Sequence, residues 1–311
     1  MGLQRHFVLP FNASTFTGES NGFKEYRLNA YEARRSSMNM ASTDPGTYSQ
    51  GHSDSVVRVH ATRSAEADAS FLLPHLRKNM DILDCGCGPG SITCDFASIV
   101  SDGSVAGIDM SPEVLQQART VARSRGLHNV TFNTADISTG LPFPDDTFDV
   151  VYCHQFLLHI PQPVQAVREM RRVCKTGGLV ACREGDLDEC FFYPEISGVQ
   201  NFMAALVADV SKYGGSSKAG RQLHVWAQEA GFEPDNITVS FGVNGYATQE
   251  RRDLLAGGFI DRLANSQTRE NFLEAGNSEK DLDDMRRDLD SWRVDPNGWQ
   301  FTPQGEILCT K

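Results

Sequence analysis

The sequence lacks the segments that would place a protein in or across a membrane. None of its 311 residues form a run of about 18 apolar residues, the length a spanning helix needs. The N-terminus has no positively charged stretch followed by an apolar segment, which argues against a secretory signal peptide. Met1-Gly2 does not begin a myristoylation motif, because His6 occupies the Ser/Thr position. We therefore expect a cytoplasmic protein without a membrane span.

Positive charge is also scarce. Lys and Arg total 29 against 40 for Asp and Glu, which gives a net charge of −11. An enzyme that acts on nucleic acid needs a basic surface for the phosphates. The one basic run, from Arg168 to Lys175, has helical spacing and predicts a solvated helix face. We expect no nucleic-acid partner.

Cysteines are present, but not in the patterns that staple a fold or bind a metal. The chain has eight, with Cys85 and Cys87 one residue apart and no C-x-x-C spacing elsewhere. This distribution predicts neither a disulfide framework nor a zinc site. We expect free, mostly buried thiols and no metal.

The order of expected elements predicts an α/β fold with a doubly wound sheet. Short apolar runs alternate with helical patterns, which is typical of parallel strands joined by right-handed crossovers. Ser111-Pro112 and Gly126 mark the start and end of one of these helices. The expected strands are 80–85, 104–109, 130–133, 148–153 and 179–183, and the expected helices are 54–77, 92–99, 112–125 and 163–174.

The chain divides into three parts. Residues 1–50 are rich in Asn, Ser, Thr and Gly and are expected to form an N-terminal arm. Residues 51–190 form the Rossmann-like core. Residues 191–311 hold cap helices and two late strands, 237–246 and 298–309, that complete the sheet.

The first strand-to-helix junction, from Asp84 to Gly90, carries the strongest chemical signal. Its glycines allow a tight turn and close approach of a ligand to the backbone. Asp109 ends the second strand, where an acid accepts hydrogen bonds from ribose hydroxyls in Rossmann-type folds. Asp136 follows the third strand and is placed to accept from an adenine amino group. Because parallel strands end at one edge of the sheet, these groups are expected to line one crevice.

The spacing of the glycines favours one nucleotide ligand over another. In a dinucleotide fingerprint the third glycine follows the second by three residues, but Gly90 follows Gly88 by two. Asp84 is poorly placed beside a pyrophosphate and well placed beside an ammonium group. S-adenosylmethionine carries an adenosine, an amino-acid end and a cationic sulfonium, so an acidic site suits it better than it suits phosphates.

These motifs together resemble those of class I S-adenosylmethionine-dependent methyltransferases. The resemblance rests on five ordered segments: 83–90, 107–111, 135–137, 148–154 and 175–179. The most similar branch is the ubiquinone/menaquinone-biosynthesis type, with related small-molecule enzymes that include many of secondary metabolism. The sequence lacks the Asn/Asp-Pro-Pro-Tyr signature of amino-methylating nucleic-acid enzymes, since Cys153-His154-Gln155-Phe156 stands in its place. The resemblance implies a Rossmann-like sheet of about seven strands with the last one antiparallel.

The resemblance also implies which residues bind S-adenosylmethionine. The glycine loop would approach the methionine moiety, Asp109 the ribose and Asp136 the adenine. The segment before the first core helix often folds over the donor in this family, and we expect Tyr48 to approach it. The complete set of expected cofactor-binding residues is Tyr48, Asp84, Gly86, Cys87, Gly88, Gly90, Asp109, Met110, Asp136, Ile137, His154 and Gln155.

Candidates for the chemical step follow the strand ends. Methyl transfer from a sulfonium needs alignment of nucleophile, methyl and sulfur, and a base helps where the nucleophile carries a proton. His154 has the best position for a base, but it is equally a residue that shapes the donor site by hydrogen bonding. His159 is either a base or a packed histidine, and Asp186 either orients the substrate or pairs with Arg183.

The substrate candidates are His52, Arg183 and Tyr193. Tyr193 belongs to an aromatic patch that also contains Phe191 and Phe192, and this patch either lines an apolar pocket or packs as ordinary core. We expect a small, apolar or aromatic acceptor of the quinone or secondary-metabolite type. Two alternatives stay open, an NAD(P)-dependent oxidoreductase and a donor-binding relative that transfers no methyl group. The sequence distinguishes neither the acceptor atom nor the oligomeric state.

Overall fold

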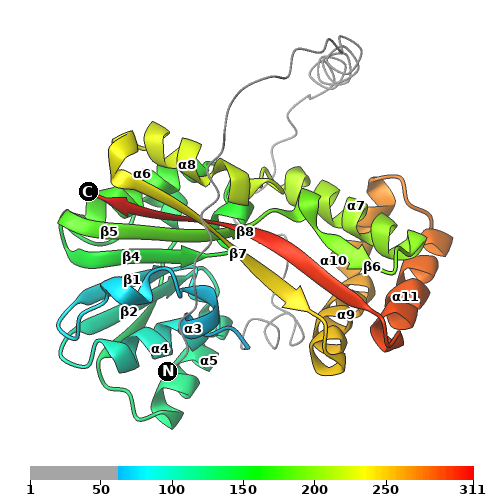
Figure 1. The fold of residues 1–311 in the computed structure, drawn as a ribbon, viewed down its shortest axis with the longest axis horizontal. Coiled ribbons are helices and arrows are strands. Elements are labelled where there is room, and N and C mark those ends of the chain that lie inside the picture. Colours follow the sequence, from blue (N-terminus) through cyan, green and yellow to red (C-terminus); the bar gives the residue numbers. More distant parts are fainter. Residues whose placement is uncertain (1–61) are drawn as a thin grey trace, which may run out of the picture. The chain divides into compact units, whose positions relative to one another are not determined.

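The computed structural model describes residues 62–311, which form an eight-stranded sheet with helices on both faces (Figure 1). The strand order is β3-β2-β1-β4-β5-β8-β6, with β7 also paired to β8. The first five strands are parallel to one another. Their bounds are β1 Asp81–Cys85, β2 Ser104–Asp109, β3 Val130–Thr134, β4 Phe148–His154 and β5 Cys174–Gly185.

Beyond β5, the sheet continues with antiparallel strands. Strand β8 (Trp299–Thr310) pairs with β5 along its C-terminal half and with the short β6 (Phe191–Tyr193) at its start. Strand β7 (Ile237–Tyr246) pairs with β8 along its whole length. The late antiparallel strands confirm the expected fold. The three-residue β6 raises the strand number from about seven to eight, and nothing in its short aromatic sequence marked it as a strand.

Two apolar layers hold the helices to the sheet. One layer packs β-strand residues against α6 (Pro163–Val173) and α8 (Ala219–Glu229), around side chains such as Leu83, Val151 and Met170. The other packs the opposite face against α3 (Ala65–Asp68) and α4 (Ser91–Ile99), around Ile82, Phe96 and Val150. Helix α5 (Pro112–Ser124) packs on β3 through Leu115 and Phe132. Because Leu83 and Ile82 are adjacent, the strand buries both faces, as parallel strands do.

The remaining helices gather around the outer end of β8 and form a cap (Figure 1). They are α7 (Ser197–Lys212), α9 (Gln249–Ala264), α10 (Ser266–Glu274) and α11 (Glu279–Val294). Their shared core contains Phe192, Phe202, Phe272 and Trp292, all at most 7% exposed. The cap therefore has an apolar, strongly aromatic interior of its own.

The helix expected over 54–77 is wrong within the described residues. Helix α3 covers only Ala65–Asp68, and a single 3-10 turn, η1 (Leu73–His75), follows it. Pro74 lies in that turn and removes a backbone donor, which shortens any helix that reaches it. Ser64 caps α3 by accepting a hydrogen bond from the Ala67 N–H.

All eight cysteines are free thiols, and most of them are buried. Within residues 62–311, no group of three or more His, Cys, Asp or Glu side chains could hold a metal ion, and no helix is both long and apolar enough to cross a membrane.

Candidate active site

The loop between β1 and α4 depends on its glycines. Gly86, Gly88 and Gly90 all have positive φ angles, of 70°, 53° and 78°, which L-residues rarely adopt. The Gly86 and Cys87 N–H groups donate to the Ile108 carbonyl at 2.8 and 2.9 Å, which fixes the turn to β2. A Cβ on Gly86 would lie 2.3 Å from the Phe156 ring, whereas one on Gly88 would meet nothing within 4 Å. The backbone at Gly88 is therefore bare and faces open space.

Asp109 connects this loop to the end of β2. Its Oδ2 accepts from the Gly88 N–H at 3.0 Å and its Oδ1 from the Ser111 N–H at 3.0 Å. The side chain stays half-buried. Each carboxylate oxygen has two acceptor positions, so the group can hold the loop and still accept hydroxyl donors from a ligand.

Asp136 follows β3 and caps the short helix η2 (Ile137–Thr139). Its Oδ1 accepts from the Ser138 N–H at 2.8 Å and from the Ser138 hydroxyl at 2.7 Å. Ile137 is buried, and Met110, beside Asp109, is 39% exposed. The exposed, apolar Met110 suits the flat face of a heterocycle.

Asp84 lies beneath the glycine loop and is buried. Its Oδ2 accepts from the Thr93 hydroxyl of α4 at 2.6 Å. Burial raises the pKa of Asp84 to about 7, although the Thr93 hydrogen bond opposes the rise and the nearby Asp109 adds to it. A nearby cation would favour the charged form, as expected for a group that faces an ammonium.

The strand register brings these groups to one edge. Cys85 pairs with Ile108 on one side and with Cys153 on the other, so the glycine loop, Asp109 and His154 follow neighbouring positions. Asp109 pairs with Thr134, which places Asp136 just beyond. The bare loop and the half-buried acids fit an adenosyl group with an amino-acid tail.

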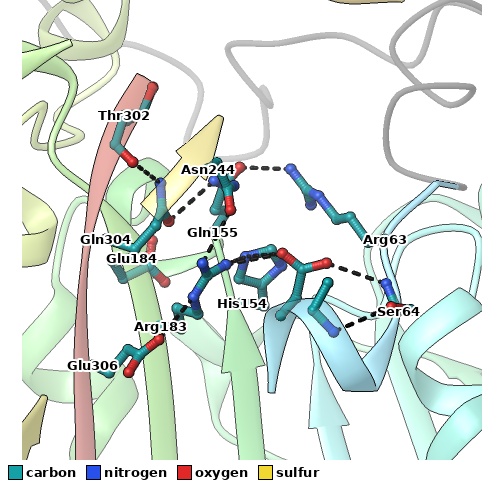
Figure 2. Close-up of polar contacts among 12 residues, drawn as sticks. Arg63, Ser64, His154, Gln155, Arg183, Glu184, Asn244, Thr302, Gln304 and Glu306 are labelled. Atoms are coloured by element: carbon teal, nitrogen blue, oxygen red, sulfur yellow. Dashed lines mark hydrogen bonds and ion pairs between the residues drawn. The ribbon is translucent and has the colours of Figure 1, made fainter. Parts of the chain in front are cut away.

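The end of β4 carries a buried charged network (Figure 2). Arg183 Nε donates to Glu306 Oε1 at 3.0 Å, Nη1 to Asp68 Oδ1 at 2.9 Å, and Nη2 to Asn244 Oδ1 at 3.0 Å. Arg183 Nη1 also contacts His154 Nε2 at 3.1 Å. A guanidinium only donates, so His154 Nε2 accepts, and its lone pair is directed at Arg183 rather than at a ligand.

Arg183 therefore pairs with different carboxylates from the one expected. Asp186 binds Arg221 of α8 through both carboxylate oxygens, with the Arg221 Nη2 at 2.7 Å from Oδ1. The proposed Asp186–Arg183 pair is wrong, because β5 ends at Gly185 and the chain turns towards α8 there. Arg183 is 2% exposed and its contacts serve the sheet and α3.

His159 lies in η3 (Leu157–His159) and has a strongly perturbed titration. Burial, together with the positive charges of Arg262 and Arg63, lowers the pKa of His159 to about 3. The imidazole is therefore neutral at physiological pH, and its conjugate acid is too strong for an efficient base. The catalytic roles of His154, His159 and Asp186 stay predictions, and their contacts favour positioning.

Glu184 is a positioning group that the sequence reasoning did not single out. Its fully buried carboxylate accepts from three backbone N–H groups, those of Phe156 and Leu157 at 2.9 and 2.8 Å and that of Leu158 at 3.3 Å. These bonds hold the chain that leaves β4. The preceding Gln155 has a φ of 46°, a strained value for a non-glycine residue, and its N–H donates to the Arg183 carbonyl at 2.9 Å.

Three further residues were expected at the site. Tyr48 and His52 lie outside the described residues. Tyr193 is 50% exposed and pairs with Trp299, on the side of the sheet opposite to Phe192. Successive strand residues point to opposite faces, so Phe192 and not Tyr193 packs with the cap. The structure does not bring Tyr193 to this edge.

A row on β8 lies beside Gln155 and was also missed. Gln304 Oε1 accepts from Gln155 Nε2 at 3.3 Å, and Arg63 Nη2 donates to Gln155 Oε1 (Figure 2). Gln304 belongs to a period-two set with Gln300 and Thr302, a pattern that ordinarily indicates a solvated strand face. Here that face is buried.

Comparison with known proteins agrees with this geometry. The model of a methyltransferase-domain family matches residues 76–231. The chain is 35% identical over 233 residues to an uncharacterized methyltransferase of Schizosaccharomyces pombe, covering 73% of this chain and 83% of that protein. It is 31% identical over 150 residues to a ubiquinone/menaquinone biosynthesis C-methyltransferase of Bdellovibrio bacteriovorus, covering 48% and 60%.

A solved methyltransferase structure shares the fold of the described residues. Coclaurine N-methyltransferase, bound to N-methylheliamine and S-adenosylhomocysteine, superposes with a TM-score of 0.52 at 15% identity and covers 94% of this chain and 90% of its own.

Proposed function

Because this chain belongs to the class I S-adenosylmethionine-dependent methyltransferases, we propose that it methylates a small, mainly apolar or aromatic metabolite. The observation that carries this substrate class is the aromatic interior of the cap, which contains Phe192, Phe202 and Trp292. The cap stands beyond the carboxyl ends of the parallel strands, the side on which such sheets bind ligands. One similar protein supports it, since it is named for ubiquinone/menaquinone biosynthesis.

The donor is assigned to the glycine edge. We propose that the loop Gly86–Gly90 receives the methionine end, with Asp84 near its ammonium. Asp109 accepts from the ribose hydroxyls, and Asp136 accepts from the adenine amino group. The support for these roles is the bare backbone at Gly88 and the position of both acids at neighbouring strand ends.

S-adenosylmethionine, when bound, supplies a methyl group on a positively charged sulfur. The contribution of this chain is then mainly alignment, since a fixed orientation alone lowers the barrier of a two-reactant step substantially. Glu184 holds the backbone of residues 156–158, and Phe156 in turn packs on Gly86. His154 is held by Arg183, so we assign it to shaping the donor site.

A methyl-transfer experiment tests the proposed substrate class. The protein is incubated with S-adenosylmethionine labelled in the methyl group and with a panel of naphthohydroquinones, catechols and benzylisoquinoline amines. Phosphoethanolamine and total RNA serve as polar comparison acceptors. We expect label in the organic extract of at least one aromatic member. Transfer confined to phosphoethanolamine or RNA would contradict the proposal.

A further inference from the structure

The polar row on β8 is buried, which is costly for such side chains. Gln300, Thr302, Gln304 and Glu306 occupy alternate positions and so share one face of the strand. Each is at most 9% exposed. A polar group removed from water is destabilising unless it finds a hydrogen-bonding partner. The partners of each member therefore indicate what the row is for.

The inner end of the row is fully engaged (Figure 2). Glu306 accepts from Arg183 at 3.0 Å and from the Ser240 hydroxyl at 2.8 Å. Gln304 accepts from Gln155 and donates through Nε2 to the Thr302 carbonyl at 3.3 Å. These contacts are internal to the protein and account for the inner half.

The outer end of the row, at Gln300, has an unsatisfied polar atom. Gln300 Nε2 donates to the Thr302 hydroxyl at 2.7 Å and contacts Cys190 Sγ at 2.6 Å. Gln300 Oε1 is buried and has no hydrogen-bonding partner in the described part of the chain. The hydrogen bond from Nε2 fixes the orientation of the amide. Oε1 is therefore an oriented acceptor without a donor.

The surroundings of Gln300 are aromatic. Phe192 pairs with it from β6 and Tyr246 pairs with it from β7, so the amide stands between two rings on the same face. Phe192 makes an edge contact with Trp292 of α11, with ring centroids 5.1 Å apart. A ligand at this place meets flat apolar surfaces and one hydrogen-bond acceptor.

The row also leads from the donor edge, which comprises the loop Gly86–Gly90 with Asp109 and Asp136, to the cap. Gln304 contacts Gln155, the residue that directly follows β4. Gln300 lies four residues farther along β8, about 13 Å at the usual rise of a strand. That length is comparable to a two- or three-ring molecule with its reacting atom near the donor.

We propose that Gln300 is a specificity-determining residue, whose Oε1 accepts a hydrogen bond from a hydroxyl group of an aromatic acceptor substrate. The proposal rests on the methyl transfer to aromatic metabolites proposed above and narrows it to hydroxylated aromatics. A substrate hydroxyl satisfies the buried acceptor, and the rings of Phe192 and Tyr246 hold the apolar body.

Matched aromatic probes test this inference. Fluorescence titration measures the affinities of 2-naphthol, 2-methoxynaphthalene and naphthalene in the presence of saturating S-adenosylhomocysteine. One buried hydrogen bond contributes about 1 kcal/mol, so the wild type should bind 2-naphthol about fivefold to tenfold more tightly than the other two probes. The methoxy compound accepts but cannot donate, and it should therefore bind like naphthalene.

Gln300→Met keeps the side-chain volume and removes the acceptor. It should reduce the preference for 2-naphthol to less than about twofold and leave naphthalene affinity unchanged. Gln228→Met, on the exposed face of α8, is the matched control and should keep the preference.

The outcomes separate this inference from the proposed function. If the wild type binds S-adenosylhomocysteine but not 2-naphthol, or binds 2-naphthol and 2-methoxynaphthalene equally, the role of Gln300 is overturned while donor binding stands. A preference retained in Gln300→Met overturns it as well. The comparison of probes needs only the wild type, so it decides the matter even if the variant does not fold. Failure to bind S-adenosylhomocysteine would remove the proposed function, and this inference with it.

Discussion

The donor edge and the polar row on β8 lie at the same end of the sheet, but they satisfy their polar groups in different ways. At the donor edge, half-buried carboxylates such as Asp109 accept from backbone N–H groups of the adjoining loop. On β8, buried side chains pair with other side chains far away in sequence, as Arg183 does with Glu306. The first arrangement leaves acceptor positions for a ligand, and the second ties strands of the sheet to one another and to α3.

The difference predicts separate consequences for substitution. A change at the donor edge should alter ligand affinity more than folding. A change at the inner end of the β8 row should alter folding, because it leaves a buried charge without its partner.

The largest effect is expected for Arg183→Met. The variant removes the guanidinium that pairs with both Asp68 and Glu306, leaves two buried carboxylates without their cation, and should lower the free energy of unfolding by about 3–5 kcal/mol. Urea denaturation measures it. Arg125→Met breaks the partly exposed pair with Asp95 and should cost no more than about 1 kcal/mol. Equal losses of unfolding free energy in the two variants would mean that the buried ion pairs of Arg183 do not stabilise the antiparallel side of the sheet.

Gly86→Ala should affect the donor edge next most strongly. The new Cβ meets the Phe156 ring at a φ of 70°, and strain of about 1–3 kcal/mol should shift the loop. We expect S-adenosylhomocysteine to bind at least tenfold more weakly in calorimetry. Gly126→Ala has a similar φ of 65° but open space around it, so it should reduce stability without changing affinity. An unchanged affinity in Gly86→Ala would place the donor elsewhere.

Glu184→Gln should change how the free energy of unfolding depends on pH. Burial raises the pKa of Glu184 from its ordinary 4.5 to about 7, although three backbone N–H groups and Arg63 oppose the rise. The folded state then holds the proton more tightly, so this stabilisation is complete below pH 4.5 and is lost as the pH rises to about 7.

The wild type should therefore lose more stability than Glu184→Gln between pH 4.5 and pH 8. Urea denaturation of both proteins across this range measures the difference. Asp84 contributes a shift of the same sign, but it is present in both proteins and cancels. Cys153, which also interacts with Glu184, has its pKa raised far above this range by burial. Parallel pH profiles would contradict the buried, protonatable state of Glu184.

The contrast between the donor edge and the β8 row also explains which parts of the structure could be predicted from the sequence. The donor edge was predictable because its signals are local: Ser111-Pro112 starts α5, glycines turn β1 into α4, and the acids follow strand ends. Strand β2 has the bounds expected for it, and β7 does too. The structure and the related proteins confirm the fold and the S-adenosylmethionine donor.

The β8 row was not predictable for a physical reason. Several of its partners come from segments more than 100 residues away, such as Gln155 for Gln304 and Cys190 for Gln300. Alternating polar residues ordinarily indicate contact with water, but this face of β8 is buried in the folded protein. The prediction of an Asp186–Arg183 pair was wrong for a similar reason. The two residues are close in sequence, but the fold brings Arg221 of α8 to Asp186 instead.

The most direct test of the account is one calorimetric titration with S-adenosylhomocysteine, repeated for the wild type, Asp109→Asn and Gln300→Met. If Asp109 accepts from the ribose and Gln300 faces only the acceptor substrate, Asp109→Asn should weaken binding about tenfold or more, since it removes a charged acceptor, while Gln300→Met should bind like the wild type. Wild-type affinity for S-adenosylhomocysteine in Asp109→Asn would contradict the assignment of Asp109 to the donor. A comparable loss of affinity in Gln300→Met would contradict the assignment of Gln300 to the acceptor substrate.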